Sequence, residues 1–220
     1  MKNIRDFCIK ACLITETALI IIIAVICGYS YSNIVNQAYN LAGNKVFDAV
    51  VAAVSFADGD ILKNWKPGDE HTPEYKSAHQ FCTNIKNSFG IDYIYFFTRD
   101  GDSGEFKFIL DTDINIPEPV GSVYDVPESE YITAAFEGGY IAAPVLEDEW
   151  GIFTTAYAPL YDSAGNVAAI AGADYRISSI ESDARDNFFN YIIVCAPVFI
   201  IIFILAAAGY FIIYKTHKIK

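Results

Sequence analysis

Residues 156–175 read AYAPLYDSAGNVAAIAGADY, two apolar segments separated by a polar one. The polar segment, residues 161–166 (YDSAGN), is rich in the Asp, Ser, Gly and Asn residues that favour tight turns. We therefore expect two strands at residues 150–160 and 167–177, with a third at residues 140–146 before them. Strands joined by so short a turn pair antiparallel, so this part of the chain predicts an antiparallel sheet.

A second pair of strands is expected earlier in the chain. Residues 91–98 (IDYIYFFT) are rich in aromatic and β-branched side chains, and residues 105–111 (EFKFILD) alternate polar and apolar positions. Between them, residues 99–104 (RDGDSG) have the composition of a turn. Together these segments predict a hairpin.

Helical patterns surround the predicted strands. Apolar residues recur with helical spacing over residues 32–56 and again over residues 73–88, with a turn-rich loop at residues 58–72. A short helix is expected at residues 128–136, because Gly138 and Gly139 form a strong stop signal. The order predicts an α+β fold, with a five-stranded antiparallel sheet and a long N-terminal helix.

Two apolar blocks enclose this domain. Residues 191–214 contain no charged side chain, and at ~1.5 Å per residue they are long enough to cross a ~30 Å hydrocarbon core. Residues 11–31 form the other block, which we interpret as an uncleaved signal anchor because no small-residue cleavage site follows it. Glu16 lies inside this block, where a carboxylate either contacts a partner helix or occupies a hydrated position near the membrane surface.

Charge predicts the orientation of the chain. Lys2, Arg5 and Lys10 precede the first span and three lysines follow the second, and basic residues favour the cytoplasmic side. We therefore expect cytoplasmic segments at residues 1–10 and 215–220 and an extracytoplasmic domain at residues 32–190. That domain holds 9 Lys and Arg against 25 Asp and Glu, so its net charge of −16 disfavours nucleic acid as a partner. Of five cysteines only Cys82 lies in it, which excludes an internal disulfide.

Several segments, taken in series between two spans, resemble the extracytoplasmic Cache family of PAS-like sensor domains in bacterial transmembrane receptors. They are DYIYFF at residues 92–97, FILDTD at residues 108–113, DEWG at residues 148–151, and residues 156–175. The resemblance implies a small ligand held between the sheet and the short helix with its loops. It also implies a parallel homodimer that signals through a shift of the second span. Receptors of the family continue into a cytoplasmic transmitter. Here only residues 215–220 follow the second span, so we expect either a truncated reading of a longer receptor or a separate transmitter protein.

Asp174 is the leading candidate for ligand binding. It lies in an otherwise apolar strand, where an unpaired carboxylate would be costly to bury. It either holds a ligand ammonium group, as the resemblance implies, or pairs with Arg176 on the same face of the strand. Aromatic residues with polar tips suit a pocket wall. Acidic residues outnumber basic ones, which favours an amine or amino acid over a polycarboxylate, while Arg99, Lys107 and Arg176 leave a carboxylate ligand open. The remaining candidates are Trp150, Tyr157, Tyr95, Tyr93, Tyr124, Asp111 and Asp148.

Catalytic signals are weak. The GDSG at residues 101–104 lies in a hairpin turn without a convincing histidine partner, and His79 and Cys82 share a helix face without a third ligand. We therefore expect no enzyme activity, metal or cofactor, and predict a small-molecule sensor. The alternatives are a membrane-anchored regulatory or binding subunit that acts through a partner protein and, less favoured, an extracytoplasmic hydrolase.

Overall fold

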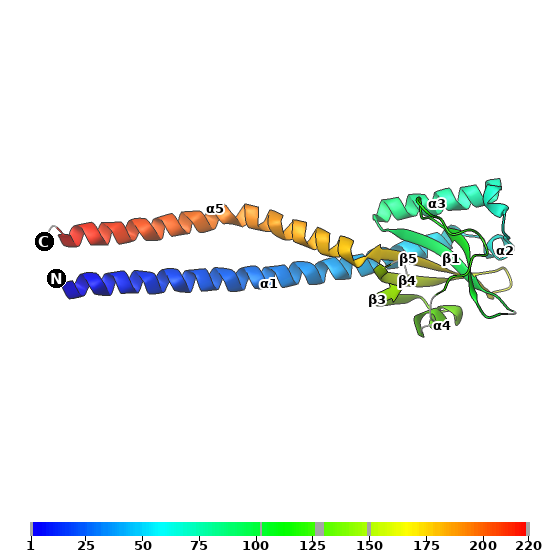
Figure 1. Cartoon of the computed structure of the whole chain (residues 1–220), viewed down its shortest axis with the longest axis horizontal. Helices are drawn as coiled ribbons and strands as arrows, with labels where there is room; N and C mark the ends of the chain where they lie inside the picture. The colour runs from blue at the N-terminus through cyan, green and yellow to red at the C-terminus, as the bar shows by residue number, and fades with distance from the viewer. Residues whose placement is uncertain (1, 102, 126–129, 149–150, 219–220) are drawn as a thin grey trace. The chain divides into compact units, whose positions relative to one another are not determined.

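The computed structural model describes residues 2–101, 103–125, 130–148 and 151–218 of the chain (Figure 1). The predicted order of elements is confirmed. Two short helices in the segment predicted as a loop are additional to the prediction. The elements are α1 (Lys2–Phe56), α2 (Gly59–Leu62), η1 (Asp69–His71), α3 (Pro73–Phe89), β1 (Tyr93–Arg99), β2 (Phe106–Asp111), α4 (Glu130–Phe136), β3 (Ile141–Asp148), β4 (Gly151–Tyr161), β5 (Val167–Arg176) and α5 (Ile177–Lys218).

The five strands form one antiparallel sheet in the order β2-β1-β5-β4-β3. The last strand in the sequence, β5, therefore occupies the centre, between the hairpin β1–β2 and the hairpin β3–β4. A central strand is covered on both faces, which explains why β5 reads as a nearly continuous run of Ala, Gly and Ile. This confirms the predicted α+β fold with a five-stranded antiparallel sheet.

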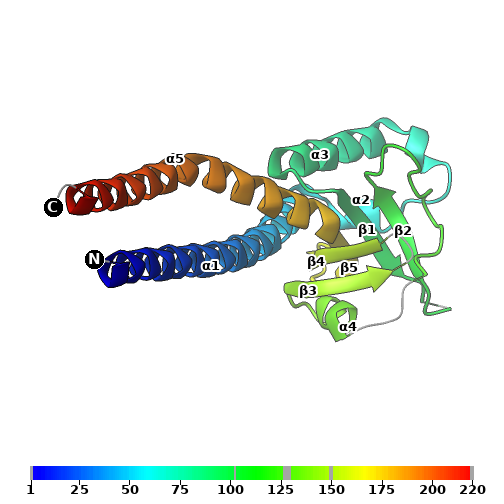
Figure 2. The same ribbon diagram turned by 60° about the vertical axis from the view of Figure 1, so that its left-hand side comes forward.

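Helices cover the two faces of the sheet. α3 contacts β1, whereas α4 contacts β3, β4 and β5. Figures 1 and 2 show α3 and α4 on opposite sides of the sheet. Because side chains alternate along a strand, Ile94 and Phe96 point to one face of β1, and Tyr95 and Phe97 point to the other. All four are buried, so both faces contribute to the core.

Sequence signals set the limits of α3. Thr72 lies just before the helix, and its hydroxyl accepts a hydrogen bond from the N–H of Tyr75. Pro73 occupies the first position, where its missing N–H costs no helical hydrogen bond. Gly90 ends the helix with φ at 62°, a left-handed conformation that glycine adopts without strain. The chain then turns directly into β1.

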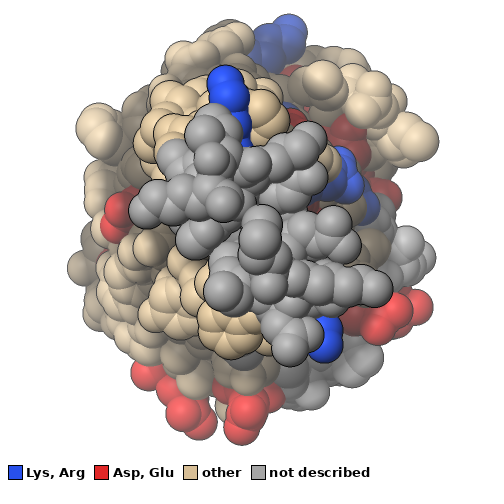
Figure 3. All heavy atoms as spheres, turned by 90° about the vertical axis from the view of Figure 1, so that its left-hand side faces the viewer, with Lys and Arg blue, Asp and Glu red and all other residues tan. Residues whose placement is uncertain are grey.

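The chain divides into two compact units. One is Tyr39–Ile180, which contains the sheet, and the other joins the residues up to Ala38 with those from Glu181 onward. The helices α1 and α5 supply the second of these units. Both are long and apolar enough to cross a membrane, and the most apolar 18-residue stretch of each is exposed. Uncharged side chains make up most of the described surface on the face drawn in Figure 3. Two apolar helices flanking the domain fit a membrane protein.

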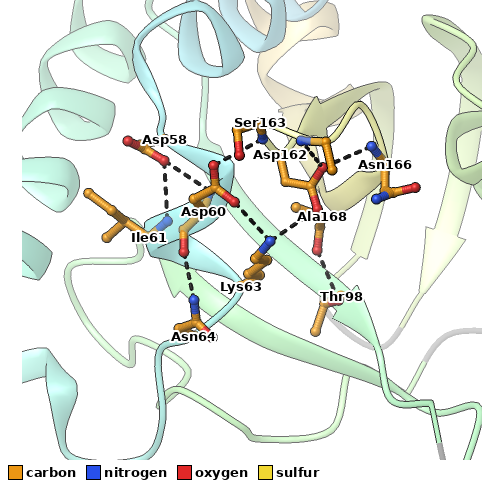
Figure 4. A network of polar contacts seen from close by, with 11 residues as sticks. Asp58, Asp60, Ile61, Lys63, Asn64, Thr98, Asp162, Ser163, Asn166 and Ala168 are labelled. Carbon is orange, nitrogen blue, oxygen red and sulfur yellow. Dashed lines mark hydrogen bonds and ion pairs between the residues drawn. The ribbon is translucent and has the colours of Figure 1, made fainter.

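A polar network attaches α2 to the turn between β4 and β5 (Figure 4). The Lys63 ammonium contacts Asp60 at 2.9 Å and Asp162 at 3.0 Å, and the N–H of Ser163 donates to Asp60 at 2.9 Å. The hydrogen bond from Lys63 lowers the pKa of Asp60 to about 2. Gly59 lies so close to this turn that a Cβ there would be 2.3 Å from the carbonyl oxygen of Tyr161. Only glycine fits this contact.

We predict that Gly59→Ala destabilises the domain by ~1–3 kcal/mol, because the carbonyl of Tyr161 belongs to the backbone and cannot rotate away. The matched control is Gly43→Ala in α1, where a Cβ meets nothing within 4 Å. Alanine is a better helix former than glycine, so the control should gain ~0.5–1 kcal/mol. Thermal unfolding of the full chain in detergent, followed by tryptophan fluorescence, measures both. Equal melting temperatures for the two variants would contradict the packing described.

Candidate ligand-binding site

The register of the sheet aligns two rows of side chains across the three central strands. In one row, Asp174 of β5 lies opposite Tyr93 of β1 on one side and Thr155 of β4 on the other. In the next row, Gly172 of β5 lies between Tyr95 and Tyr157. Directly opposite residues in an antiparallel sheet share a face, so these side chains all point to the face that α4 covers.

A cavity of about 160 Å³ opens beside these rows. Its wall combines residues of the sheet with residues of the loop that follows β2. The lining residues are Tyr93, Tyr95, Phe108, Asp111, Asp113, Ile116, Glu118, Tyr124, Phe153 and Asp174. The loop residues at its mouth are half-buried or exposed, and Ile116 has 77% of its surface accessible. Among the described residues none from α4 lines the cavity, whereas the sequence resemblance implied a ligand between the sheet and the short helix with its loops.

Asp174 is a buried charge of the cavity wall. Only 6% of its surface is exposed. Its Oδ1 accepts hydrogen bonds from the Thr155 hydroxyl at 2.7 Å and from the Tyr95 hydroxyl at 3.4 Å. These two donors partly replace the water that a carboxylate loses on burial. The carboxylate is thus held in a fixed position in the cavity wall.

Two tyrosines complete the polar interior. The hydroxyls of Tyr95 and Tyr124 lie 3.1 Å apart, and their ring centroids are 5.5 Å apart in an edge-to-face arrangement. Burial, reinforced by the charge of Asp174, raises the pKa of both hydroxyls well above the ordinary value. Both therefore keep their protons at neutral pH. The Tyr95 ring lies across Gly172, where a Cβ would come within 2.4 Å of ring carbons.

Asp111 organises the loop that forms the mouth. Its carboxylate accepts the N–H of Asp113 at 3.0 Å and the N–H of Glu118 at 2.9 Å, which draws the two ends of this loop segment together. Burial raises the pKa of the Asp111 carboxyl, and the two N–H bonds act against that change. Farther along, the N–H of Val120 donates to the Glu70 carboxylate at 2.8 Å. The loop is therefore fixed from two sides.

Arg176 lies behind two of the lining rings. Its guanidinium donates to the Tyr93 hydroxyl at 2.9 Å and lies 4.6 Å from the centroid of the Phe153 ring. This is a cation–π arrangement, which orients the ring and keeps the guanidinium charge against it. Arg176 is not among the residues that line the cavity.

Five of the eight residues predicted from the sequence line the cavity: Asp174, Tyr95, Tyr93, Tyr124 and Asp111. Tyr157 is buried beside it, in an aromatic cluster where its ring centroid lies 6.1 Å from that of Phe97. Trp150 and the side chain of Asp148 lie outside the described residues. Sequence reasoning did not select Phe108, Phe153, Ile116 or Glu118. The alternation along β4, which gives Phe153 the same face as Thr155, was a usable signal for one of them.

Other reactive groups do not gather at a site. Among the residues that the structure describes, no three His, Cys, Asp or Glu side chains form a group that could hold a metal ion. Burial raises the pKa of the Cys82 thiol to about 12, so this side chain stays protonated and is a poor nucleophile. The cavity is therefore the feature of the domain that calls for a functional explanation.

Solved structures of sensory domains are similar to this chain. One is the ligand-binding domain of the Campylobacter jejuni chemoreceptor Tlp3 in complex with 4-methylisoleucine, with 14% identity and a TM-score of 0.40 over 69% of this chain and 62% of that chain. Another is the periplasmic sensory domain of the C. jejuni chemoreceptor Tlp1, with 10% identity and a TM-score of 0.45 over 69% and 59%. The extracellular domain of the putative histidine kinase mmHK1S-Z2 follows, with 15% identity and a TM-score of 0.37 over 69% and 62%.

The chain thus spans about 62% of the length of the Tlp3 domain that it matches. No protein-family model matches the chain, and no curated protein matches it. The similar structures are sensory domains of chemoreceptors and of a histidine kinase, the class of protein that the sequence resemblance predicted. At these identities and TM-scores the likeness carries no argument about the ligand, so what the cavity binds is argued from its own residues.

Proposed function

We propose that this chain is a membrane-anchored sensor whose extracytoplasmic domain binds a small amine or amino-acid-like molecule. The observation that carries this proposal is the Asp174 carboxylate, which is 6% exposed and lines a cavity walled by aromatic rings. Thr155 and Tyr95 supply two of its hydrogen-bond partners, both neutral. A ligand ammonium group would add a positively charged partner, which would neutralise the Asp174 carboxylate in a poorly hydrated site.

The size of the cavity supports a small ligand. Its volume of about 160 Å³ is close to that of engineered cavities of ~150 Å³ that take up a benzene molecule. Drug-sized ligands occupy pockets of ~300 Å³ or more. The proposed ligand is therefore on the order of the size of benzene, with its cationic end at Asp174 and its apolar body against the tyrosine and phenylalanine rings.

The connection between the cavity and α5 supports a role in signalling. Asp174 lies at the end of β5, and α5 begins three residues later at Ile177. Asp92 joins this junction to the sheet, because its N–H donates to the Asp174 carbonyl at 2.9 Å and its carboxylate accepts the N–H of Arg176 at 2.7 Å. A ligand that displaces Asp174 would thus act directly on the start of α5, which is continuous to Lys218.

The membrane arrangement belongs to the same proposal. Basic residues before the first apolar block and after the second favour both termini in the cytoplasm, with the sensor domain outside. The domain would act as a homodimer, as the resemblance implies. An open cavity favours this function over a regulatory subunit, which needs only an outer surface for its partner.

Asp174→Asn tests the charge of this carboxylate in the cavity wall. The amide keeps the shape and an oxygen acceptor but removes the charge, so a ligand amine should bind ~10–100-fold more weakly. Amino acids, amines, nucleobases and carboxylates are screened by thermal shift on the full chain in detergent, and the strongest binder is titrated calorimetrically against both proteins. Asp48→Asn, an exposed position on α1, is the control and should bind normally. Unchanged affinity in Asp174→Asn would show that the site is elsewhere.

Gly172→Ala tests the cavity's shape. The new Cβ would lie 2.4 Å from carbons of the Tyr95 ring, so the ring must move from its position between Asp174 and Tyr124. We expect the strongest binder from the screen to lose at least roughly tenfold in affinity, because displacement of the Tyr95 ring breaks both contacts of its hydroxyl. Gly101→Ala is the matched control, since a Cβ there meets nothing within 4 Å. Calorimetry on both variants decides, and full affinity in Gly172→Ala would rule out the arrangement of Tyr95 described above.

A further inference from the structure

Among the described residues that line the cavity, every charged side chain is acidic. Four of the lining residues are acidic, and none of the described lining residues is Lys, Arg or His. Asp174 and Asp111 are more than nine-tenths buried, while Asp113 and Glu118 lie at the half-buried mouth. An anionic group that entered the cavity would therefore lie among four carboxylates, two of them buried where little water screens the repulsion.

Basic side chains in the neighbourhood already have other partners. The buried Lys86 ammonium donates to the carbonyl of Thr112 at 2.8 Å, and Lys107 is paired with Asp100. Arg176 donates to Tyr93 and packs against the Phe153 ring. A ligand carboxylate would have to remove one of these groups from its partner, which lowers the affinity it could gain.

Backbone donors of the mouth loop are occupied as well. Successive N–H groups in a loop commonly form a nest that binds an anion. Here the Asp111 carboxylate takes the N–H groups of residues 113 and 118, and the Asp113 carboxylate takes those of residues 115 and 116. Glu70 takes the N–H of residue 120. The protein's own carboxylates thus fill the positions that a ligand carboxylate would need.

The rest of the wall suits a cation with an apolar body. Five aromatic rings line the cavity, and ring faces attract organic ammonium groups while their edges and faces pack against carbon. We infer that the site selects a compact organic cation that carries no carboxylate, and that it discriminates against the α-amino acid of the same carbon skeleton. This inference rests on the proposed function, because it concerns the ligand of the same cavity.

Matched ligands separate the two charges of an amino acid. Isobutylamine and isoamylamine have the skeletons of L-valine and L-leucine without the carboxylate, and 4-methylpentanoate has the leucine skeleton without the amine. Each is titrated calorimetrically into the full chain in detergent, at neutral pH and low salt. We expect the amines to bind more tightly than the paired amino acids by roughly tenfold or more, and 4-methylpentanoate to show no binding.

The outcomes distinguish this inference from the proposed function. An amino acid that binds as tightly as its paired amine, and loses affinity in Asp174→Asn, would overturn the discrimination but leave the sensor pocket in place. Absence of binding by every amine and amino acid in the panel to a chain that unfolds cooperatively would overturn both. If 4-methylpentanoate bound and the amines did not, the site would select an anion, and this would overturn the inference.

A charge variant at the mouth provides a second measurement. Glu118→Gln keeps the size of a lining side chain and removes one of the four acidic groups, so it should raise the affinity for L-leucine relative to isoamylamine several-fold. Glu137→Gln, an exposed position in the turn after α4, should leave that ratio unchanged. If the ratio of the affinities for L-leucine and isoamylamine were the same in the wild type and in Glu118→Gln, the mouth carboxylates would have no role in selecting the ligand.

Discussion

A carboxylate that is buried on the inner face of a central strand constrains much of this domain. Asp174 needs donors at fixed positions, and the sheet supplies them because its register places Thr155 beside it and Tyr95 in the adjacent row. The Tyr95 ring reaches that position only because Gly172 leaves space beneath it. The glycine two residues before Asp174 in β5 is thus needed for the position of the Tyr95 ring.

The loop after β2 depends on acidic side chains in a different way. Asp111, Asp113 and Glu70 serve as acceptors for its backbone N–H groups and so replace a regular hydrogen-bond ladder. Two of these carboxylates, Asp111 and Asp113, also line the cavity. The structure of the loop and the charge of the cavity wall are therefore linked, since a substitution that changed one would change the other. The acidic composition of the domain has a local structural role here, in addition to any effect on solubility.

Much of the architecture could be predicted from the sequence because its signals are local. Strand alternation, the turn at residues 161–166 and the glycines after α4 each act over a few residues, and they gave the strands and helices nearly to their ends. α2 was missed, because its stability depends on Lys63 and on contacts with a turn about a hundred residues away. Of the site, Asp174 stood out as a carboxylate in an apolar strand, and Tyr93 and Tyr95 as aromatic residues with polar tips on a predicted strand. Ile116 and Glu118, in contrast, reach the cavity through a loop whose path no local pattern specifies.

A crystal structure of the full chain grown with isoamylamine would show whether the cavity holds an organic cation at Asp174. We expect ligand density in the cavity lined by Tyr93, Tyr95 and Tyr124, with its nitrogen ~2.7–2.9 Å from a carboxylate oxygen of Asp174. Ligand density at another surface, or a cavity filled by the side chains that now line it, would contradict the account.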